Sequence, residues 1–233
     1  MSIFLSVLKI GIPLILALLN VHQFLYSRNP KYYYFYMKVF KKWRDTTWSI
    51  HSNYTVSKDL NFFKAFEQSI DELFETKNKV VNLPNKKQYN FGNFSLLVLY
   101  DLDVSNSDKV NIDINFNPLN VTYKNATARL SELRKLFLSL ERKINASKTH
   151  YNMDIQFTGV TNPFYGLMIQ RLGEEHVNHF ECTFNLSTLI TKENGASNLS
   201  TNNKLRVYKQ KITINESSFD VIEDVAKNIL LMR

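Results

Sequence analysis

MSIFLSVLKIGIPLILALLNVHQFLY, residues 1–26, is the most apolar stretch of this chain, and the rest of the sequence is arranged behind it. A helix that crosses a bilayer needs about 20 mostly apolar residues. The stretch offers this length when Lys9 extends to one interface and the partly polar segment 20–23 lies near the other. The sequence therefore predicts a single transmembrane anchor over residues 1–26.

A cleavable signal peptide is the alternative interpretation of the same stretch. Lys9 would supply its charge and residues 10–19 its short apolar region, with cleavage before Arg28. Signal peptides end at a pair of small residues, and none follows Leu19. The missing cleavage site favours an anchor that stays on the chain.

Residues 27–48 combine aromatic rings with cations. Tyr36, Phe40 and Trp43 recur at helical spacing with lysines between them, which is typical of an amphipathic helix along a membrane surface. Anionic headgroups are the expected partner, and a base-stacking surface for nucleic acid is unlikely beside an anchor. The residues predicted at the membrane interface are Arg28, Lys31, Tyr34, Tyr36, Lys38, Phe40, Lys41, Lys42, Trp43 and Arg44.

Two signals point to opposite sides of the membrane. Cations close to a spanning helix mark its cytoplasmic side, and they cluster after Tyr26, so we expect the C-terminal part on the cytoplasmic or organelle-interior side. Asn-x-Ser/Thr triplets accept glycans only in a luminal or extracellular domain. They begin at Asn53, Asn93, Asn120, Asn125, Asn145, Asn185, Asn198 and Asn215. Such residues also suit turns and helix caps, so a luminal or secreted glycoprotein stays an alternative.

Residues 49–233 have the length of one ordinary domain. The chain is 44% apolar, which is enough for a core, and its single cysteine, Cys182, excludes an internal disulfide. The net charge of +8 favours an anionic membrane surface before nucleic acid.

Hydrophobic periodicity predicts an α+β fold for this domain. Apolar residues at helical spacing predict helices over 57–76, 122–144 and 217–232. Runs of alternating or continuous apolar residues predict strands over 91–101, 110–116, 153–158, 180–186 and 205–214. Residues 78–90 are polar and contain Pro84, which predicts a flexible loop. We therefore expect a mostly antiparallel four- to five-stranded sheet with helices packed on one face.

Candidate metal ligands gather in one short segment. His176, His179 and Cys182 lie close in sequence, but on a strand His179 would point away from the other two. The turn over 101–108 resembles a calcium loop only in part, because Ile112 stands where that loop needs a bidentate glutamate. We therefore predict no metal, and the absence of phosphate-loop and hydrolase motifs predicts no cofactor and no catalytic residue.

Three functions remain open from the sequence. The favoured one is a membrane-anchored, non-enzymatic interaction or assembly module that presents its α+β domain to protein partners in a larger complex. The first alternative is a ligand-sensing or enzymatic domain, with a pocket between sheet and helices. Polar residues expected in such a pocket are Asn111, Asp113, Gln156 and Glu181. The second alternative is the luminal or secreted glycoprotein.

Overall fold

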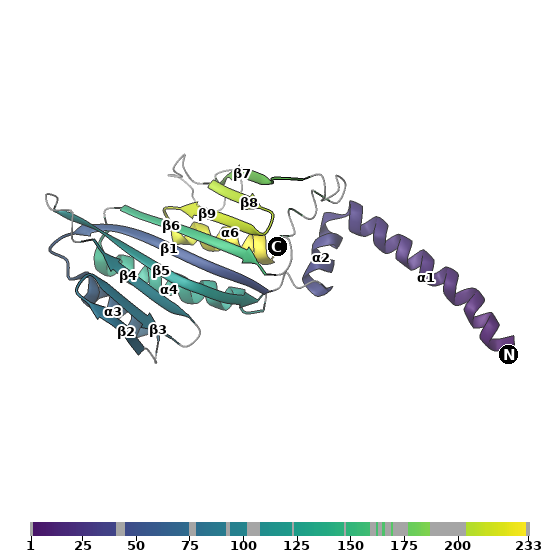
Figure 1. Cartoon of the computed structure of the whole chain (residues 1–233), viewed down its shortest axis with the longest axis horizontal. Helices are drawn as coiled ribbons and strands as arrows, with labels where there is room; N and C mark the ends of the chain where they lie inside the picture. The colour runs from purple at the N-terminus through teal and green to yellow at the C-terminus, as the bar shows by residue number, and fades with distance from the viewer. Residues whose placement is uncertain are drawn as a thin grey trace.

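The computed structural model consists of an α+β domain and two N-terminal helices that lead into it (Figure 1). It describes residues 2–40, 45–74, 78–91, 94–101, 108–122, 124–146, 148–158, 162, 165, 169, 177–186 and 204–231. The helices are α1 (Ser2–Arg28), α2 (Pro30–Phe40), α3 (Phe62–Leu73), α4 (Ala126–Ile144) and α6 (Phe219–Leu231). The strands are β1 (Asp45–Ser57), β2 (Asn78–Leu83), β3 (Lys86–Asn90), β4 (Ser95–Tyr100), β5 (Lys109–Thr122), β6 (Lys148–Phe157), β7 (Glu181–Asn185), β8 (Lys204–Tyr208) and β9 (Lys211–Glu216).

The described strands form one antiparallel sheet in the order β2-β3-β4-β5-β1-β6-β9-β8-β7. The long strand β1 lies near its centre and pairs with β5 on one side and β6 on the other. Helices α3, α4 and α6 cover one face of the sheet (Figure 1). Among the described elements, no helix covers the opposite face.

The core lies between the sheet and these three helices. Along β1, Trp48, Ile50 and Tyr54 are buried, whereas the alternate residues Ser49 and His51 are not. This alternation follows from the two-residue repeat of a strand, which directs successive side chains to opposite faces. In α4, the predicted apolar stripe is buried, and its members are Leu130, Leu133, Phe137, Leu140 and Ile144.

The predicted strand number is wrong, because the sheet has nine described strands where we expected four or five. Residues 78–90, predicted as a flexible loop, form the β2–β3 hairpin, and the single strand predicted over 205–214 is the β8–β9 hairpin. Strand β1 is missing from the prediction, because the aromatic and basic pattern over 27–48 indicates a helix across its first residues. In the structure, α2 ends at Phe40, and residues 41–44 lie outside the described part of the chain.

The predicted transmembrane anchor is also wrong. Within the ranges that the structure describes, no helix has both the length and the apolar content needed to cross a membrane. The predicted single-pass membrane location, with the domain on the cytoplasmic side, depends on this anchor and is therefore wrong as well.

Candidate functional site

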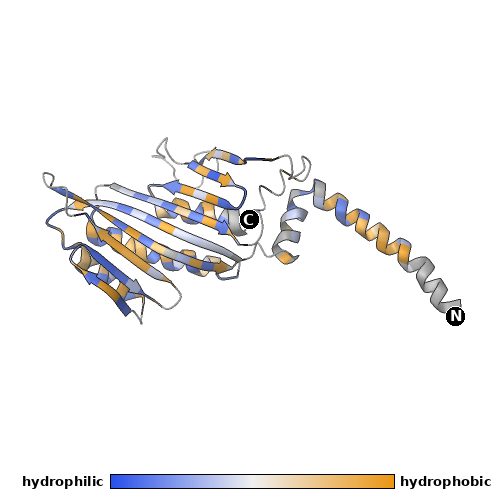
Figure 2. Cartoon of the chain, viewed as in Figure 1, coloured by the Kyte–Doolittle hydropathy of each residue, from blue (hydrophilic) through white to orange (hydrophobic). Residues whose placement is uncertain are grey.

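Helix α1 extends away from the sheet and is rich in hydrophobic residues over its described part (Figure 2), and many of its large apolar side chains are exposed. These side chains are 51% to 62% exposed and are Ile12, Leu14, Ile15, Leu16, Leu18, Leu19, Val21 and Phe24. Consecutive residues of a helix are rotated by about 100°, so this set points in every direction around the axis. From Ile12 to Leu19 the helix therefore has no polar side, and exposed polar residues begin at Asn20.

An aromatic cluster fixes the corner between α1 and α2. The His22 ring lies 4.7 Å from Tyr36, and the Tyr26 ring lies 5.0 Å from Tyr33. Tyr33 is only 2% exposed and belongs to the domain core, so α2 is attached to the domain and α1 to α2. Asn29 begins α2 by accepting a hydrogen bond from the backbone N–H of Tyr32 at 3.1 Å. Asparagine before a proline is a typical helix start.

The residues predicted at a membrane interface do not share one environment. Arg28 and Lys31 are exposed, and the Arg28 guanidinium lies 5.2 Å from the Phe24 ring centre. Tyr36 is half-buried in the aromatic cluster. The side chains of Tyr34, Lys38 and Phe40 lie outside the described part of the chain, as do Lys41, Lys42, Trp43 and Arg44.

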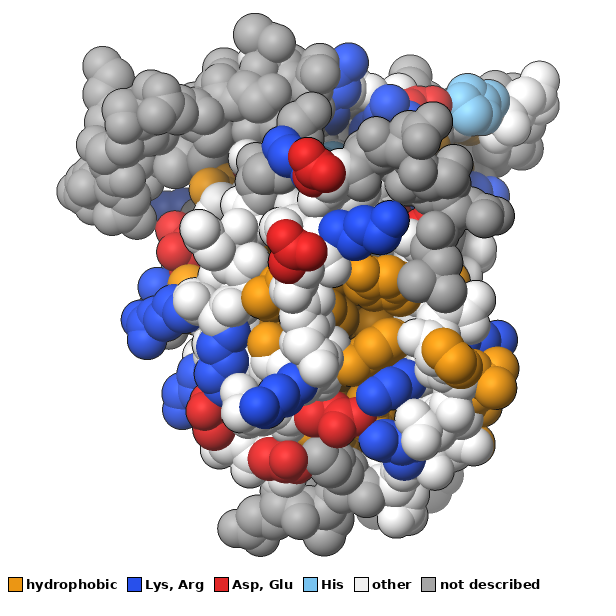
Figure 3. Space-filling view, turned by 90° about the vertical axis from the view of Figure 1, so that its left-hand side faces the viewer, with side chains coloured by type: hydrophobic (Ala, Val, Ile, Leu, Met, Phe, Trp, Pro, Cys, Tyr) orange, Lys and Arg blue, Asp and Glu red, His pale blue; other side chains and the backbone are white. Residues whose placement is uncertain are grey.

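A second apolar area lies at the opposite end of the molecule, where α3, β2 and β3 meet. Hydrophobic side chains there are surrounded by lysines and carboxylates (Figure 3). Val80 is 60% exposed and Leu83 is 53% exposed, both on the edge strand β2. This pair is much smaller than the apolar surface of α1.

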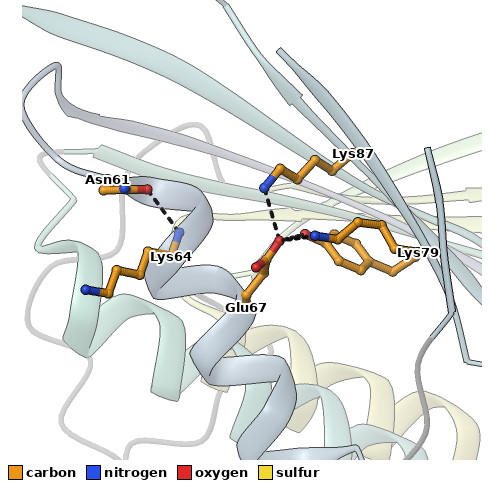
Figure 4. A network of polar contacts seen from close by, with 6 residues as sticks. Asn61, Lys64, Glu67, Lys79 and Lys87 are labelled. Carbon is orange, nitrogen blue, oxygen red and sulfur yellow. Dashed lines mark hydrogen bonds and ion pairs between the residues drawn. The ribbon is translucent and has the colours of Figure 1, made fainter. Parts of the chain in front are cut away.

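Glu67 joins α3 to the β2–β3 hairpin at this end (Figure 4). One carboxylate oxygen accepts hydrogen bonds from Lys79 at 2.8 Å, Lys87 at 3.0 Å and Tyr89 at 2.8 Å. Burial raises the pKa of Glu67, but hydrogen bonds from Lys79, Tyr89 and Lys87 outweigh burial and lower it to about 2. Strongly shifted carboxylates often mark active sites. Here all three donors are structural neighbours, so Glu67 serves to hold α3 on the hairpin.

Glu67→Gln should make the protein less sensitive to acid. Because its folded-state pKa lies below the ordinary value of 4.5, Glu67 stabilises the fold above pH 4.5 and loses this effect as the pH falls towards 2. We expect the variant to lose about 1 kcal/mol at neutral pH and to show a shallower fall in stability below pH 4.5. Urea unfolding across this range measures both effects. Glu132→Gln, which breaks a pair within α4, is the control and should leave the acid slope unchanged.

A second polar network is buried between β1, β6 and α4. The Tyr151 hydroxyl donates to Glu141 and, having one proton, must accept from the Tyr54 hydroxyl, 2.9 Å away. Burial raises the pKa of Glu141, against the lowering effect of the Tyr151 hydrogen bond, and the charge of Asp220 raises it further. Both tyrosines are fully buried. The network therefore joins the two core tyrosines to the half-buried Glu141 of α4.

The face of the sheet away from the helices is polar. Asn53 donates to Asp113 at 2.7 Å, and Thr55 donates to Asn111 at 2.9 Å, between paired positions of β1 and β5. These bonds use two of the residues that we expected in a pocket between sheet and helices. Gln156 lines a cavity at the end of β6, and Glu181 lies just outside this cavity, 3.9 Å from His179. The four predicted pocket residues are thus not brought together.

The predicted metal candidates are only partly described. His179 is exposed and Cys182 is half-buried, whereas His176 lies outside the described residues. Among the side chains that the structure describes, no group of three or more His, Cys, Asp or Glu residues is placed to hold a metal ion.

Comparisons with known proteins give no functional assignment. No protein family and no curated protein sequence matches the chain. Among solved structures, the aspartokinase alpha and beta subunits are 8% identical, with a TM-score of 0.23 over 81% of this chain and 97% of that one. A putative adenylyl cyclase from Hippeastrum is also 8% identical, with a TM-score of 0.12 over 80% of this chain and 74% of that one. Similarities at this level do not support an argument about fold or function.

Proposed function

We propose that this protein is a non-enzymatic assembly module, in which the α+β domain holds α1 outward and a partner protein encloses α1 in a larger complex. The observation that carries this proposal is the set of large apolar side chains on α1, each more than half exposed. Burying one such side chain fully stabilises a complex by about 1.5 to 3 kcal/mol. Several of them together supply a strong driving force for association.

The distribution of these side chains indicates the form of the partner. Leu14 and Leu16 are two residues apart, so they lie on nearly opposite sides of α1. A flat surface or shallow groove would cover only one of them. A helix that is apolar on all sides is stable when its whole surface is covered. The partner is therefore expected to surround α1 with apolar segments of its own.

Charge at the base of α1 disfavours parallel packing of α1 against a second copy of this chain. Arg28 and Lys31 are both exposed at the corner between α1 and α2. Parallel packing of identical helices would bring these cations together, which costs free energy. A partner with carboxylates at the entrance to its apolar cavity would instead pair with them.

Paired substitutions can test the proposal in cells that make the protein. Leu14→Gln/Leu18→Gln removes apolar surface from α1, where the two side chains are 59% and 62% exposed. Val80→Gln/Leu83→Gln removes a similar exposed surface from β2 and is the matched control. Native gel filtration measures the size of the complex for each tagged chain, and urea unfolding confirms that each variant folds.

The wild-type chain and the β2 variant should elute in a complex well above 27.3 kDa, and the α1 variant should elute near that mass. A wild-type chain that elutes alone would overturn the proposal, as would equal losses in the two variants. Flotation of the purified wild-type chain with phosphatidylcholine vesicles, without any protein partner, would also count against it.

A further inference from the structure

A cavity lies at one end of the sheet, apart from α1. It has a volume of about 400 Å³ and is formed by the end of β6, the turn between β8 and β9, and residues just before β7. Sites for small molecules typically have volumes of about 300 to 1,000 Å³. The cavity is thus large enough for a compact ligand.

Asn162 holds two walls of this cavity together. Its side chain is fully buried, donates to the backbone carbonyl of Tyr208 and accepts from the backbone N–H of Tyr165 at 2.8 Å. Its backbone N–H donates to the carbonyl of Lys209 at 2.9 Å. The β8–β9 turn is also bonded to β6, because the Phe157 N–H donates to Gln210 at 2.9 Å. These bonds form the cavity before any ligand binds.

The lining combines cations with aromatic rings. Lys209 lies in the β8–β9 turn, Lys211 begins β9, and His179 lies just before β7. These groups already have neighbours: Asp154 lies 3.3 Å from Lys211, Glu181 lies 3.9 Å from His179, and the Lys209 ammonium lies 5.7 Å from the Tyr165 ring centre. Neither carboxylate lines the cavity itself, so the charged side chains that line it are basic.

The aromatic part of the lining contains an unsatisfied polar group. Tyr165 and Phe180 pack edge to face, with ring centres 5.0 Å apart. Tyr165 is 1% exposed, and among the described residues its hydroxyl has no hydrogen-bond partner. Buried hydroxyls are nearly always paired, because an unpaired one loses its bonds to water without replacement. This hydroxyl has almost no accessible surface, so it lies behind the cavity wall and out of reach of a ligand.

We propose that this cavity binds a small organic anion, with a phosphate or carboxylate group attached to a flat ring. The anionic group pairs with Lys209 and Lys211, which lie in the β8–β9 turn and at the start of β9. The ring packs against Phe180, which is half-buried at the cavity wall. This site is independent of α1, so it adds a ligand-binding function to the assembly role.

Calorimetric titration of the full-length protein tests the site with four probes. Phenyl phosphate and benzoate carry both a ring and an anionic group, inorganic phosphate lacks the ring, and benzyl alcohol lacks the charge. At least one of the two ring-bearing anions should bind ten-fold or more tightly than both of the other probes. The ratio between phenyl phosphate and benzoate then identifies the preferred anionic group.

Variants locate the binding on the protein. Lys209→Gln/Lys211→Gln should weaken binding of the preferred anion ten-fold or more, whereas Lys64→Gln/Lys204→Gln removes the same charge elsewhere and should leave it unchanged. Phe180→Ala should weaken the ring-bearing anion but not inorganic phosphate. No binding by either ring-bearing anion at millimolar concentration would overturn the proposal. Equal losses in the two lysine pairs would overturn it as well, and neither result affects the role of α1.

Discussion

Phe137→Ala is expected to destabilise the domain by about 3 to 5 kcal/mol, the largest effect of any substitution considered for this protein. The Phe137 side chain is 1% exposed on the buried side of α4. Its ring centre lies 4.6 Å from Phe219, 5.0 Å from Tyr151 and 5.6 Å from Phe116. Phe137 therefore connects α4 with α6 and with two strands, β6 and β5. Truncation would leave a cavity at the centre of the core.

Urea unfolding measures this cost, and Phe184→Ala provides the control. Phe184 lies on the edge strand β7 and is 41% exposed, so its loss should change stability by less than about 0.5 kcal/mol. Similar costs for the two variants would mean that the helices do not pack on the sheet as described.

Tyr151→Phe should have the next largest effect, about 1 to 3 kcal/mol, because it breaks a buried network without changing the packing volume. The substitution removes the hydroxyl that donates to Glu141 and accepts from Tyr54. The buried Tyr54 hydroxyl and the half-buried Glu141 carboxylate then lose that partner. The cost comes from their lost hydration, which no new hydrogen bond replaces.

This cost should also grow as the pH rises. The pKa of Glu141 is raised by burial, so the folded chain binds the proton more tightly than the unfolded chain. The contribution of Glu141 to stability is therefore greatest below its ordinary pKa of 4.5 and falls as the pH rises through the raised value. Loss of the Tyr151 hydroxyl removes the interaction that lowers this pKa. The destabilisation by Tyr151→Phe should accordingly be larger at neutral pH than at pH 4.5.

Chemical denaturation at the two pH values measures the difference. Adding Glu141→Gln to Tyr151→Phe removes the titrating group and should abolish the pH dependence of the cost. A cost that is the same at both pH values in the single variant would show that Glu141 does not titrate against Tyr151.

The sequence predicted elements whose apolar pattern is strong and local. The stripe from Leu130 to Ile144 in α4 repeats at three and four residues, and the alternation from Val110 to Phe116 in β5 repeats at two. The α+β class followed from these patterns and agrees with the structure. Each of these elements buries one face against the core, so its period is visible in the sequence.

Strand β1 shows where this approach failed. Its alternation, from Trp48 through Ile50 to Tyr54 and Val56, was present in the sequence and could have identified the central strand. The aromatic and basic residues before Trp48 instead indicate an interfacial helix, and this pattern obscures the start of the strand. The β2–β3 hairpin had no comparable signal, since most β2 side chains are exposed and tertiary contacts such as those of Glu67 hold it in place.

The candidate surfaces were also only partly predictable. The apolar character of α1 is evident from the sequence, but the exposure of its side chains and its attachment through Tyr33 depend on the structure. The cavity beside β6 was not predictable, because Asn162 and the β8–β9 turn are distant in sequence and meet only in the fold. Of the expected pocket residues, only Gln156 lines it.

The most direct test of the proposed role of α1 is site-specific photo-crosslinking in cells that make the protein. A crosslinking residue is placed at Leu14, at Leu16 on the opposite side of α1, or at Thr55 on the polar face of the sheet as a control. The assembly role predicts that Leu14 and Leu16 both crosslink to the same protein partner and that Thr55 does not. Adducts from neither α1 position, adducts to lipid alone, or the same protein adduct from Thr55 would contradict it.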